Sequence, residues 1–214
     1  MNEIASAPAH NSDGAPVHLR TGNYMHTSSG SKYWPMDPRP AEVVIETIAH
    51  HLANRCRYNG ATQHPKHEDL IFYSVAEHSV YCSHIGPESE ALERLLHDAS
   101  EAYNGDLIRP LKYDPAFSAP FKRVEELNEH AVARRFGLVY PFPLSVKFAD
   151  EAVTAAEVRQ IIVHSPNEEW DTGKLHDDSY VAPVEIEMWL PWEAKLRFLA
   201  RFHELWDARK STIS

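Results

Sequence analysis

Cysteine, long apolar runs and positive charge are all scarce in this 214-residue sequence. The two cysteines, Cys56 and Cys82, stand far apart and form no C-x-x-C pair, so they provide no disulfide framework and fit a reducing, intracellular compartment. No run of about 18 apolar residues occurs, so we expect no segment to span a membrane. The N-terminus lacks the basic start and apolar core of a signal peptide.

Acidic residues outnumber basic ones, since 31 Asp and Glu face 21 Lys and Arg, for a formal net charge of −10. Such a chain repels phosphate backbones at long range, which argues against a stable complex with duplex nucleic acid. A small anionic substrate stays compatible, because a metal ion and a few local cations reverse the field inside a pocket.

The composition predicts one globular domain preceded by an arm. Hydrophobic residues make up 43% of the chain, an ordinary share for a globular protein, and the length suffices for one sizeable core. Residues 1–20 are small and polar and predict a flexible arm, followed by a domain over residues 21–210. Residues 20–40 are rich in Gly, Ser and Pro and predict an extended segment with a hairpin around Ser28-Ser29-Gly30.

Apolar residues recur at helical spacing along most of the remaining chain, and strand signals are few, which predicts an all-α fold. The expected helices cover residues 45–58, 73–86, 87–103, 121–136, 144–163 and those from 191 onward. Loops are expected at residues 59–69, 107–120 and 164–181. The last helix is expected to hold the apolar residues Leu196, Phe198, Leu199, Phe202 and Leu205.

The segment LLHDASEAYNGD carries the most informative cluster of polar residues. At about 100° per residue, His97, Asp98 and Glu101 share one face of the predicted helix. One imidazole and two carboxylates suit a divalent transition metal or magnesium. A solvated helix face is the alternative for an isolated His-Asp pair.

Two other segments add matching side chains. His78 lies in YSVAEHSVYCSHI, and Asp150 lies in VKFADEAVTAAEV. Either one alone would be assigned as a capping or surface residue. Together with His97 and Asp98 they offer a metal two imidazoles and two carboxylates from three helices, and helical bundles build metal sites from facing helices in this way.

The order His, His-Asp, Asp resembles the HD-domain phosphohydrolase superfamily. The stretch HDASEAYNGDLIRPLK is similar to that of bacterial 5′-deoxynucleotidases and of phage HD proteins, which include deoxyadenosine triphosphate triphosphohydrolases. The segments YSVAEHS, CRYNG, VKFAD and PWEAKLRFLARFHEL fit the same group, so the resemblance covers roughly residues 30 to 208. These motifs are specific for the superfamily and do not identify the substrate.

The resemblance implies a hydrolytic metal centre. His78, His97, Asp98 and Asp150 match its metal ligands, for a divalent ion such as Mn²⁺, Co²⁺, Mg²⁺ or Zn²⁺. Glu101 matches the acidic residue that handles the attacking water. A metal-activated water is a competent nucleophile at neutral pH, and a carboxylate one turn away is suited to orient or deprotonate it.

The resemblance also implies substrate contacts. Arg57 matches a phosphate-binding arginine, and Lys112 matches a cation near the phosphate. Tyr58 stands where the deoxynucleotidases carry an aromatic residue near the sugar, usually Trp, and Asp106 matches a residue near the ribose. Taken alone, Arg57 is equally explained as a helix-end arginine, Lys112 as a surface residue and Asp106 as a turn residue.

Two further residues are weaker substrate candidates. Trp34 has a face on which a base could stack, although an aromatic clamp over the helical core explains it as well. His64, in the loop before the second helix, is a candidate phosphate contact.

The resulting hypothesis is metal-dependent hydrolysis of phosphate from deoxynucleotides, by either a 5′-nucleotidase or a triphosphohydrolase reaction. Two alternatives are a nucleotide-sensing module without turnover and a phosphodiesterase acting on signalling nucleotides. We expect the protein to act in the cytoplasm of a bacterial cell or phage-infected host, with a small deoxynucleotide as its partner, and to form a homo-oligomer.

Overall fold

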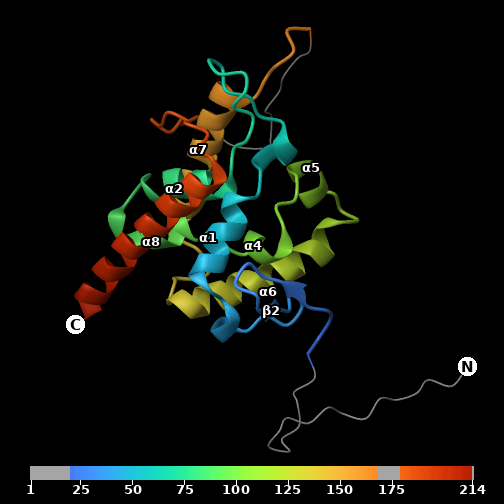
Figure 1. Ribbon diagram of the computed structural model, residues 1–214, viewed down its shortest axis with the longest axis vertical. Coiled ribbons are helices and arrows are strands. Elements are labelled where there is room, and N and C mark those ends of the chain that lie inside the picture. Colours follow the sequence, from blue (N-terminus) through green and yellow to red (C-terminus); the bar gives the residue numbers. More distant parts are fainter. Residues whose placement is uncertain (1–19, 168–178, 214) are drawn as a thin grey trace, which may run out of the picture.

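The computed structural model describes residues 20–167 and 179–213, and in that part of the chain it is helical with one small hairpin (Figure 1). The all-α prediction is therefore confirmed. The predicted arm, apart from its last residue, lies outside the described residues, as does most of the predicted loop at 164–181. The α-helices are α1 (Ile45–Ala53), α2 (Val75–Ser83), α3 (Ala91–Leu95), α4 (Glu101–Asn104), α5 (Arg109–Lys112), α6 (Ser118–Phe136), α7 (Leu144–Ile161) and α8 (Pro191–Ile213). The short elements are strands β1 (Met25–His26) and β2 (Lys32–Tyr33) and 3₁₀ turns η1 (Pro40–Glu42), η2 (Arg57–Gly60) and η3 (Glu88–Glu90).

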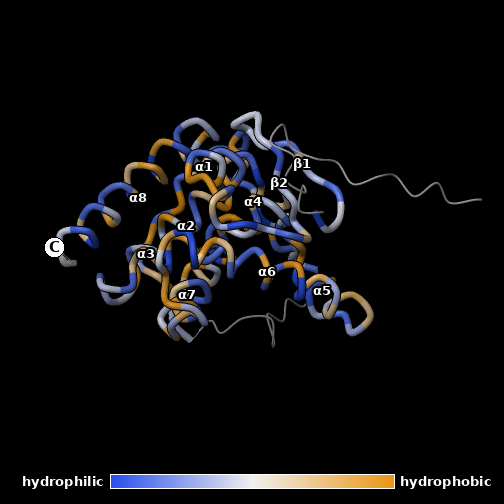
Figure 2. The backbone as a smooth tube through the Cα atoms, turned by 90° about the horizontal axis from the view of Figure 1, so that it is seen from below, coloured by the Kyte–Doolittle hydropathy of each residue, from blue (hydrophilic) through white to orange (hydrophobic). Residues whose placement is uncertain are grey.

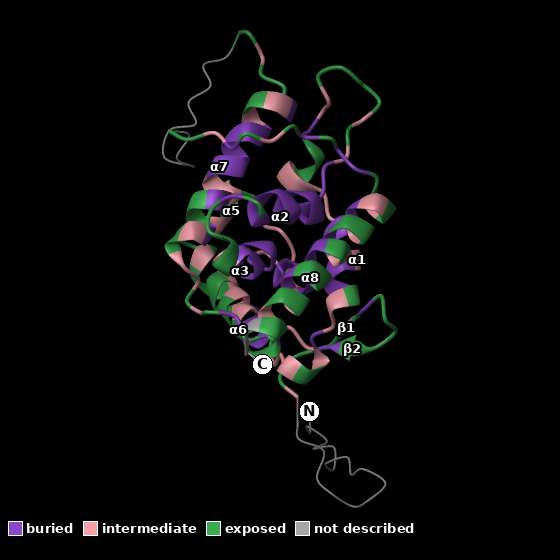
Figure 3. Cartoon of the chain, turned by 90° about the vertical axis from the view of Figure 1, so that its left-hand side faces the viewer, coloured by how far each residue is buried: buried purple, intermediate pink, exposed green. Residues whose placement is uncertain are grey.

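Helix α2 forms the centre of the molecule, and all nine of its residues are buried (Figure 3). It packs against α1, α3, α7 and α8. The side chain of Ser74 caps its first turn by accepting a hydrogen bond of 3.1 Å from the backbone N–H of Glu77. A helix surrounded by others needs no polar face, so the polar side chains that α2 does carry require partners inside the core.

Helix α8 crosses α1, α2 and α3 and covers the core from one side (Figure 1). Polar and apolar residues alternate along it (Figure 2), and Phe198, Phe202 and Leu205 are buried. Leu196 lies on this helix as predicted, and it is 59% exposed. Two residues correspond to about 200° around a helix, so Leu196 and Phe198 point to nearly opposite sides.

The predicted hairpin is confirmed. Strands β1 and β2 pair antiparallel, with Met25 opposite Tyr33, and Gly30 takes a positive φ of 78° in the connecting turn. Tyr33 is fully buried, stacks on Tyr103 with ring centroids 3.8 Å apart and donates a hydrogen bond to Asn128 of α6. The hairpin is thereby anchored to α4 and α6.

The predicted continuous helix over residues 87–103 is wrong. The chain instead forms η3 and α3, a turn over residues 96–100, and then α4. His97 Nδ1 donates to the carbonyl oxygen of Arg94 at 2.7 Å, and this contact engages the acceptor that a continuing helix would offer to Asp98. The next backbone bonds span three residues, as from Ala99 N–H to Leu96 O and from Glu101 N–H to Asp98 O.

The other predicted helices differ mainly at their ends. Helix α1 ends at Ala53 and not near residue 58, because η2 follows with Tyr58 and Asn59 at positive φ values of 52° and 53°. Helix α2 is shorter than the predicted 73–86, and α6 begins at Ser118, before the predicted 121. Across the described residues, none of the helices combines the length and the apolar character needed to cross a membrane.

Candidate metal centre

Three segments that are distant in sequence meet around His78 of α2. Its Nε2 atom lies 3.2 Å from Oδ1 of Asp150 on α7 and 3.8 Å from Oδ2 of Asp98 in the turn after α3. The His78 side chain is fully buried, and both carboxylates are mostly buried. Two acidic groups and an imidazole in such a position need a positive charge among them.

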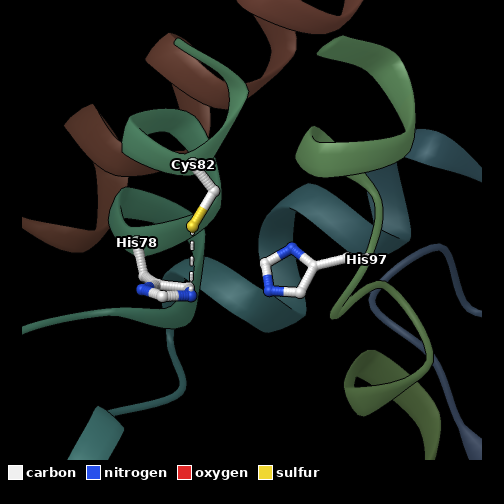
Figure 4. A group of neighbouring side chains, drawn as sticks. All are labelled: His78, Cys82 and His97. Carbon is white, nitrogen blue, oxygen red and sulfur yellow. Dashed lines mark hydrogen bonds between the residues drawn. The ribbon is translucent and has the colours of Figure 1, made fainter. Parts of the chain in front are cut away.

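His97 completes this group from the turn that breaks the third helical segment. Its Nε2 atom lies 3.2 Å from Asp98 Oδ2, and its ring centroid lies 5.4 Å from that of His78 (Figure 4). Because Nδ1 donates to the Arg94 carbonyl, Nε2 is the nitrogen that faces the cluster. This Nε2 is buried and has no hydrogen-bond partner among the described residues. A buried imidazole nitrogen that faces a carboxylate without a well-formed hydrogen bond fits a site that holds a cation.

The structure thus brings together the four residues that the sequence predicts as ligands, namely His78, His97, Asp98 and Asp150. It also adds Cys82, which the sequence analysis did not select. One potential ligand atom from each of His78, Cys82 and His97 lies within 4.8 Å of the others, so these three side chains could hold a metal ion. The available signal was the i, i+4 spacing of His78 and Cys82, which puts both on one face of α2.

Glu157 of α7 is the second residue that sequence reasoning missed, and it is fully buried beneath the cluster. Its Oε1 accepts hydrogen bonds from the Tyr73 hydroxyl at 2.8 Å and from His78 Nδ1 at 2.6 Å. Holding a proton on Nδ1 leaves Nε2 of His78 as the nitrogen available for a metal. The signal was its position seven residues after Asp150, two turns along the same helix face.

The other oxygen of Glu157 holds the 57–58 turn. Oε2 accepts from Arg57 Nε at 3.1 Å, from Arg57 Nη2 at 3.0 Å and from the Tyr58 hydroxyl at 2.6 Å. These contacts leave Nη1 of Arg57 to face Asp98 Oδ2 at 3.7 Å. Arg57 therefore presents one end of its guanidinium to the cluster, and the hydroxyl of Tyr58 is engaged with Glu157.

The charges of the cluster depend on one another. Burial alone would raise the pKa values of Asp98 and Asp150, but His97 and His78 outweigh it and hold both values well below their usual range. Burial alone would lower the pKa of His78, but Glu157 and Asp150 outweigh it and raise the value. Positive charge at the imidazoles thus favours the ionised form of the two carboxylates.

Glu101 lies at the start of α4 with only 6% of its residue surface exposed, and its Oε2 is buried without a hydrogen-bond partner among the described residues. Burial raises its pKa well above the ordinary value, and the charges of Asp98 and Asp106 raise it further. This carboxyl group is thus near the cluster and takes up a proton readily.

Two basic side chains of α5 lie near the acidic cluster. Arg109, which the sequence analysis did not select, places Nη2 3.9 Å from Oδ2 of Asp150. Lys112, which it did select, forms an ion pair of 2.7 Å with Glu125 of α6. Arg109 is therefore the α5 cation that reaches a predicted ligand.

A pocket of about 570 Å³ lies beside the C-terminal end of α1. Its lining is largely polar and consists of Ser28, His50, His51, Asn54, Arg55, Cys56, Asn59 and Asp106. Asp106 is one of the lining residues, and burial raises the pKa of its carboxyl group.

The two weaker substrate candidates lie in other surroundings. Trp34 packs against Tyr24 and beneath the guanidinium of Arg20, 4.2 Å from its ring centroid. His64 lies in the loop before α2, where its Nδ1 accepts from the backbone N–H of Lys66. Base stacking by Trp34 and phosphate contact by His64 stay predictions.

The fold and the cluster together define an all-helical protein with a histidine group that could hold a divalent metal ion. No protein-family model matches the chain. The sequence is 33% identical to the Escherichia coli protein named "Uncharacterized protein YfdR", across 88% of this chain and 98% of that protein. It is 34% identical to "Uncharacterized protein RCAP_rcc00048" of Rhodobacter capsulatus, across 83% and 92%. The chain belongs to the family of these two proteins.

A shorter similarity reaches a protein with an assigned activity. The 5′-deoxynucleotidase of Erwinia tasmaniensis is 29% identical over 82 residues, which make up 37% of this chain and 41% of the enzyme. This partial match supports an HD-domain-like relationship at most.

Proposed function

We propose that the protein is an HD-type, metal-dependent phosphohydrolase that removes phosphate groups from small deoxynucleotides. The observation that carries this proposal is the convergence of His78, His97, Asp98 and Asp150, with Nε2 of His78 3.2 Å from Asp150 and 3.8 Å from Asp98. Two imidazoles and two carboxylates form a ligand set suited to Mn²⁺, Co²⁺, Zn²⁺ or Mg²⁺.

Nε2 of His97 supports a metal at this place, since it is buried, makes no hydrogen bond among the described residues and faces Asp98 at 3.2 Å, and a bound cation would satisfy both groups. A divalent ion, when bound, supplies a Lewis acid for a phosphoryl oxygen and lowers the pKa of water to about 7. Burial and the charges of Asp98 and Asp106 raise the pKa of Glu101, so a nearby cation would be needed to favour the carboxylate form that accepts a proton.

Glu101 acts in this scheme as the general base toward the attacking water. Its free Oε2 is suited to accept the water proton as oxygen attacks phosphorus, after which the bond from phosphorus to the leaving oxygen breaks. Burial and the two neighbouring aspartates favour the protonated carboxyl, which can return that proton to the leaving group.

Arg57 and Arg109 bind the phosphate in this scheme. Glu157 fixes Arg57 through Nε and Nη2, so Nη1 is held in a defined direction toward the cluster. Arg109 approaches from α5 on the side of Asp150. Two guanidinium groups neutralise the charge of a phosphate and orient it for in-line attack.

The polar pocket next to Asp106 is the proposed place of the nucleoside. Its volume of about 570 Å³ suits a small ligand, and its side chains offer both donors and acceptors. Asp106, which lines this pocket, offers a carboxylate that can accept a hydrogen bond from the sugar. The net negative charge of the chain favours a small substrate over a nucleic acid.

The test is to incubate the purified protein with each dNMP and dNTP in the presence of Mn²⁺, Co²⁺, Mg²⁺ or Zn²⁺. Release of inorganic phosphate from a monophosphate identifies a 5′-nucleotidase, and release of triphosphate identifies a triphosphohydrolase. Absence of turnover for every combination of nucleotide and metal ion, in protein shown to contain the metal, would overturn the proposal. Hydrolysis that persists in Glu101→Gln would exclude the assigned role of Glu101.

A further inference from the structure

Cys82 lies one helical turn from His78 with its thiol turned toward the metal cluster (Figure 4). Its Sγ atom is 3.4 Å from Nε2 of His78, the nitrogen that also faces Asp98 and Asp150. Cys82 is fully buried on the innermost helix of the fold. The thiol is therefore part of the same enclosed group of donor atoms.

The distances fit a shared ion. With a zinc–nitrogen bond of about 2.0–2.1 Å and a zinc–sulfur bond of about 2.3 Å, two ligands at a tetrahedral angle are about 3.5 Å apart. The Cys82 Sγ to His78 Nε2 distance is 3.4 Å, and the His78 Nε2 to Asp150 Oδ1 distance is 3.2 Å. Sulfur and carboxylate oxygen thus stand at comparable distances from the same nitrogen.

A second observation comes from His97. Its Nε2 is buried, makes no hydrogen bond among the described residues and lies 3.2 Å from Oδ2 of Asp98. A ligand atom of His97 also lies within 4.8 Å of those of Cys82 and His78, so the thiol of α2 and the imidazole of the turn after α3 flank the same space (Figure 4). A thiol that only filled space in the core would not need this placement among two imidazoles and a carboxylate.

We propose that Cys82 is a thiolate ligand of the metal centre, so that the site selects Zn²⁺ or Co²⁺ over Mg²⁺. This inference rests on the metal centre of the proposed function and deepens it. On binding, the S–H bond of Cys82 breaks, the proton passes to solvent, and a sulfur lone pair forms the bond to the ion without any change of oxidation state. Thiolate and imidazole together favour Zn²⁺ and Co²⁺, whereas Mg²⁺ prefers oxygen donors alone.

Cobalt provides a direct test, because a thiolate bound to Co²⁺ gives a strong charge-transfer absorption in the near ultraviolet, which nitrogen and oxygen ligands do not give. The full-length protein is loaded with one equivalent of Co²⁺ under anaerobic, reducing conditions, and its cobalt content is measured by mass spectrometry. We expect the band in the wild type and its loss in Cys82→Ser and Cys82→Ala, which keep the imidazole and carboxylate ligands. Competition between Zn²⁺ and Mg²⁺ should show the preference for Zn²⁺ falling at least about tenfold in Cys82→Ser.

Cys56 provides the matched control, because the sequence contains no cysteine besides it and Cys82. In Cys56→Ser, Cys82 is the sole thiol, so a band in that variant assigns the absorption to Cys82 even where the Cys82 variants fail to fold. Circular dichroism of each variant reports its folding.

Three results would overturn the proposal. The wild type binds cobalt without showing the band, the band persists in folded Cys82→Ser, or the wild type does not bind cobalt at all. The absorption needs no turnover. A band without hydrolysis therefore supports the thiolate ligand and rejects the proposed activity, whereas hydrolysis by cobalt-loaded protein without the band does the reverse.

Discussion

Replacing Glu157 with Gln removes one charge from the group that supports the candidate metal centre while keeping the size of the side chain. Glu157 accepts hydrogen bonds from His78, Arg57, Tyr58 and Tyr73, and every one of these partners is a donor. A glutamine amide offers one acceptor oxygen and turns its NH₂ group toward donors. The substitution therefore leaves Arg57 without its buried counter-charge and at least one donor without an acceptor.

The size of the effect follows from the pKa of Glu157. Burial alone would raise this pKa, but Arg57 and His78 outweigh it and lower the value from 4.5 to about 2. At about 1.4 kcal/mol per pKa unit, this corresponds to about 3 kcal/mol of stability at neutral pH, in agreement with about 3–5 kcal/mol for breaking a buried ion pair. For a chain of this length we expect Glu157→Gln to lower Tm by about 6–12 °C.

The difference also has a definite pH dependence. Because the pKa of Glu157 is lower in the folded state than in the unfolded state, its stabilisation is complete above pH 4.5 and is lost as the pH falls toward about 2. The stability difference between the wild type and Glu157→Gln should therefore be constant near neutral pH and shrink within that acidic window.

Thermal unfolding followed by circular dichroism, with and without Zn²⁺, measures this prediction. We also expect the affinity for metal to fall about 10–100-fold, because Glu157 orients His78. Glu151→Gln is the control on the same helix, since Glu151 pairs with Lys147 at 3.7 Å near the surface and should contribute less than about 1 kcal/mol. A Tm and metal affinity for Glu157→Gln equal to those of this control would refute the reasoning.

Four further expectations can be checked in the same preparations. Glu101→Gln should lower kcat about 100-fold or more at unchanged metal content, since it removes the general base, and a loss of metal would instead indicate a structural role. Arg57→Lys should raise KM about tenfold, because an ammonium group cannot bond Glu157 through two nitrogens and also face phosphate. An unchanged KM would exclude the contact between Arg57 and phosphate. Phe198→Ala should lower the free energy of unfolding, measured with denaturant, by about 3–5 kcal/mol. Leu196→Ala, at an exposed position of the same helix, should change it by about 0.5 kcal/mol or less. Equal losses in the two variants would contradict the packing described. Removal of metal by a chelator should lower Tm and re-addition should restore it, because the ion binds only the folded centre, so an unchanged Tm would argue against a bound metal.

The helical character of the fold could be predicted from the sequence because apolar spacing survives in each amphipathic helix. The break at residues 96–100 could not, because it is accompanied by a side-chain contact, from His97 Nδ1 to the carbonyl oxygen of Arg94, that the spacing of apolar residues does not reveal. A periodic pattern of apolar residues continues through such a break. Likewise Leu196 has the composition of a core residue, and only the packing of α8 shows that its side faces away from the core.

The candidate site was predictable where residue types are unusual for their surroundings. His78 and Asp150 stand in apolar helical segments, and the His-Asp doublet of residues 97–98 adds the other candidate ligands. Glu157 could not be predicted, because a glutamate on a helix is common and its role depends on partners up to 100 residues away in sequence. Cys82 was passed over in the same way, since a single thiol on a buried helix is usually a small apolar core residue.

The hydrogen bond from His97 to the Arg94 carbonyl has a consequence for how this chain tolerates change. Nε2 of the His97 imidazole faces the cluster. Nδ1 of the same ring bonds the Arg94 carbonyl, the acceptor that the next helical N–H would use. A side chain at position 97 without a donor in that place frees the carbonyl, and α3 can then grow into the turn and rotate the residues that follow. Asp98 and Glu101 would then move together, because both follow residue 97 in this part of the chain.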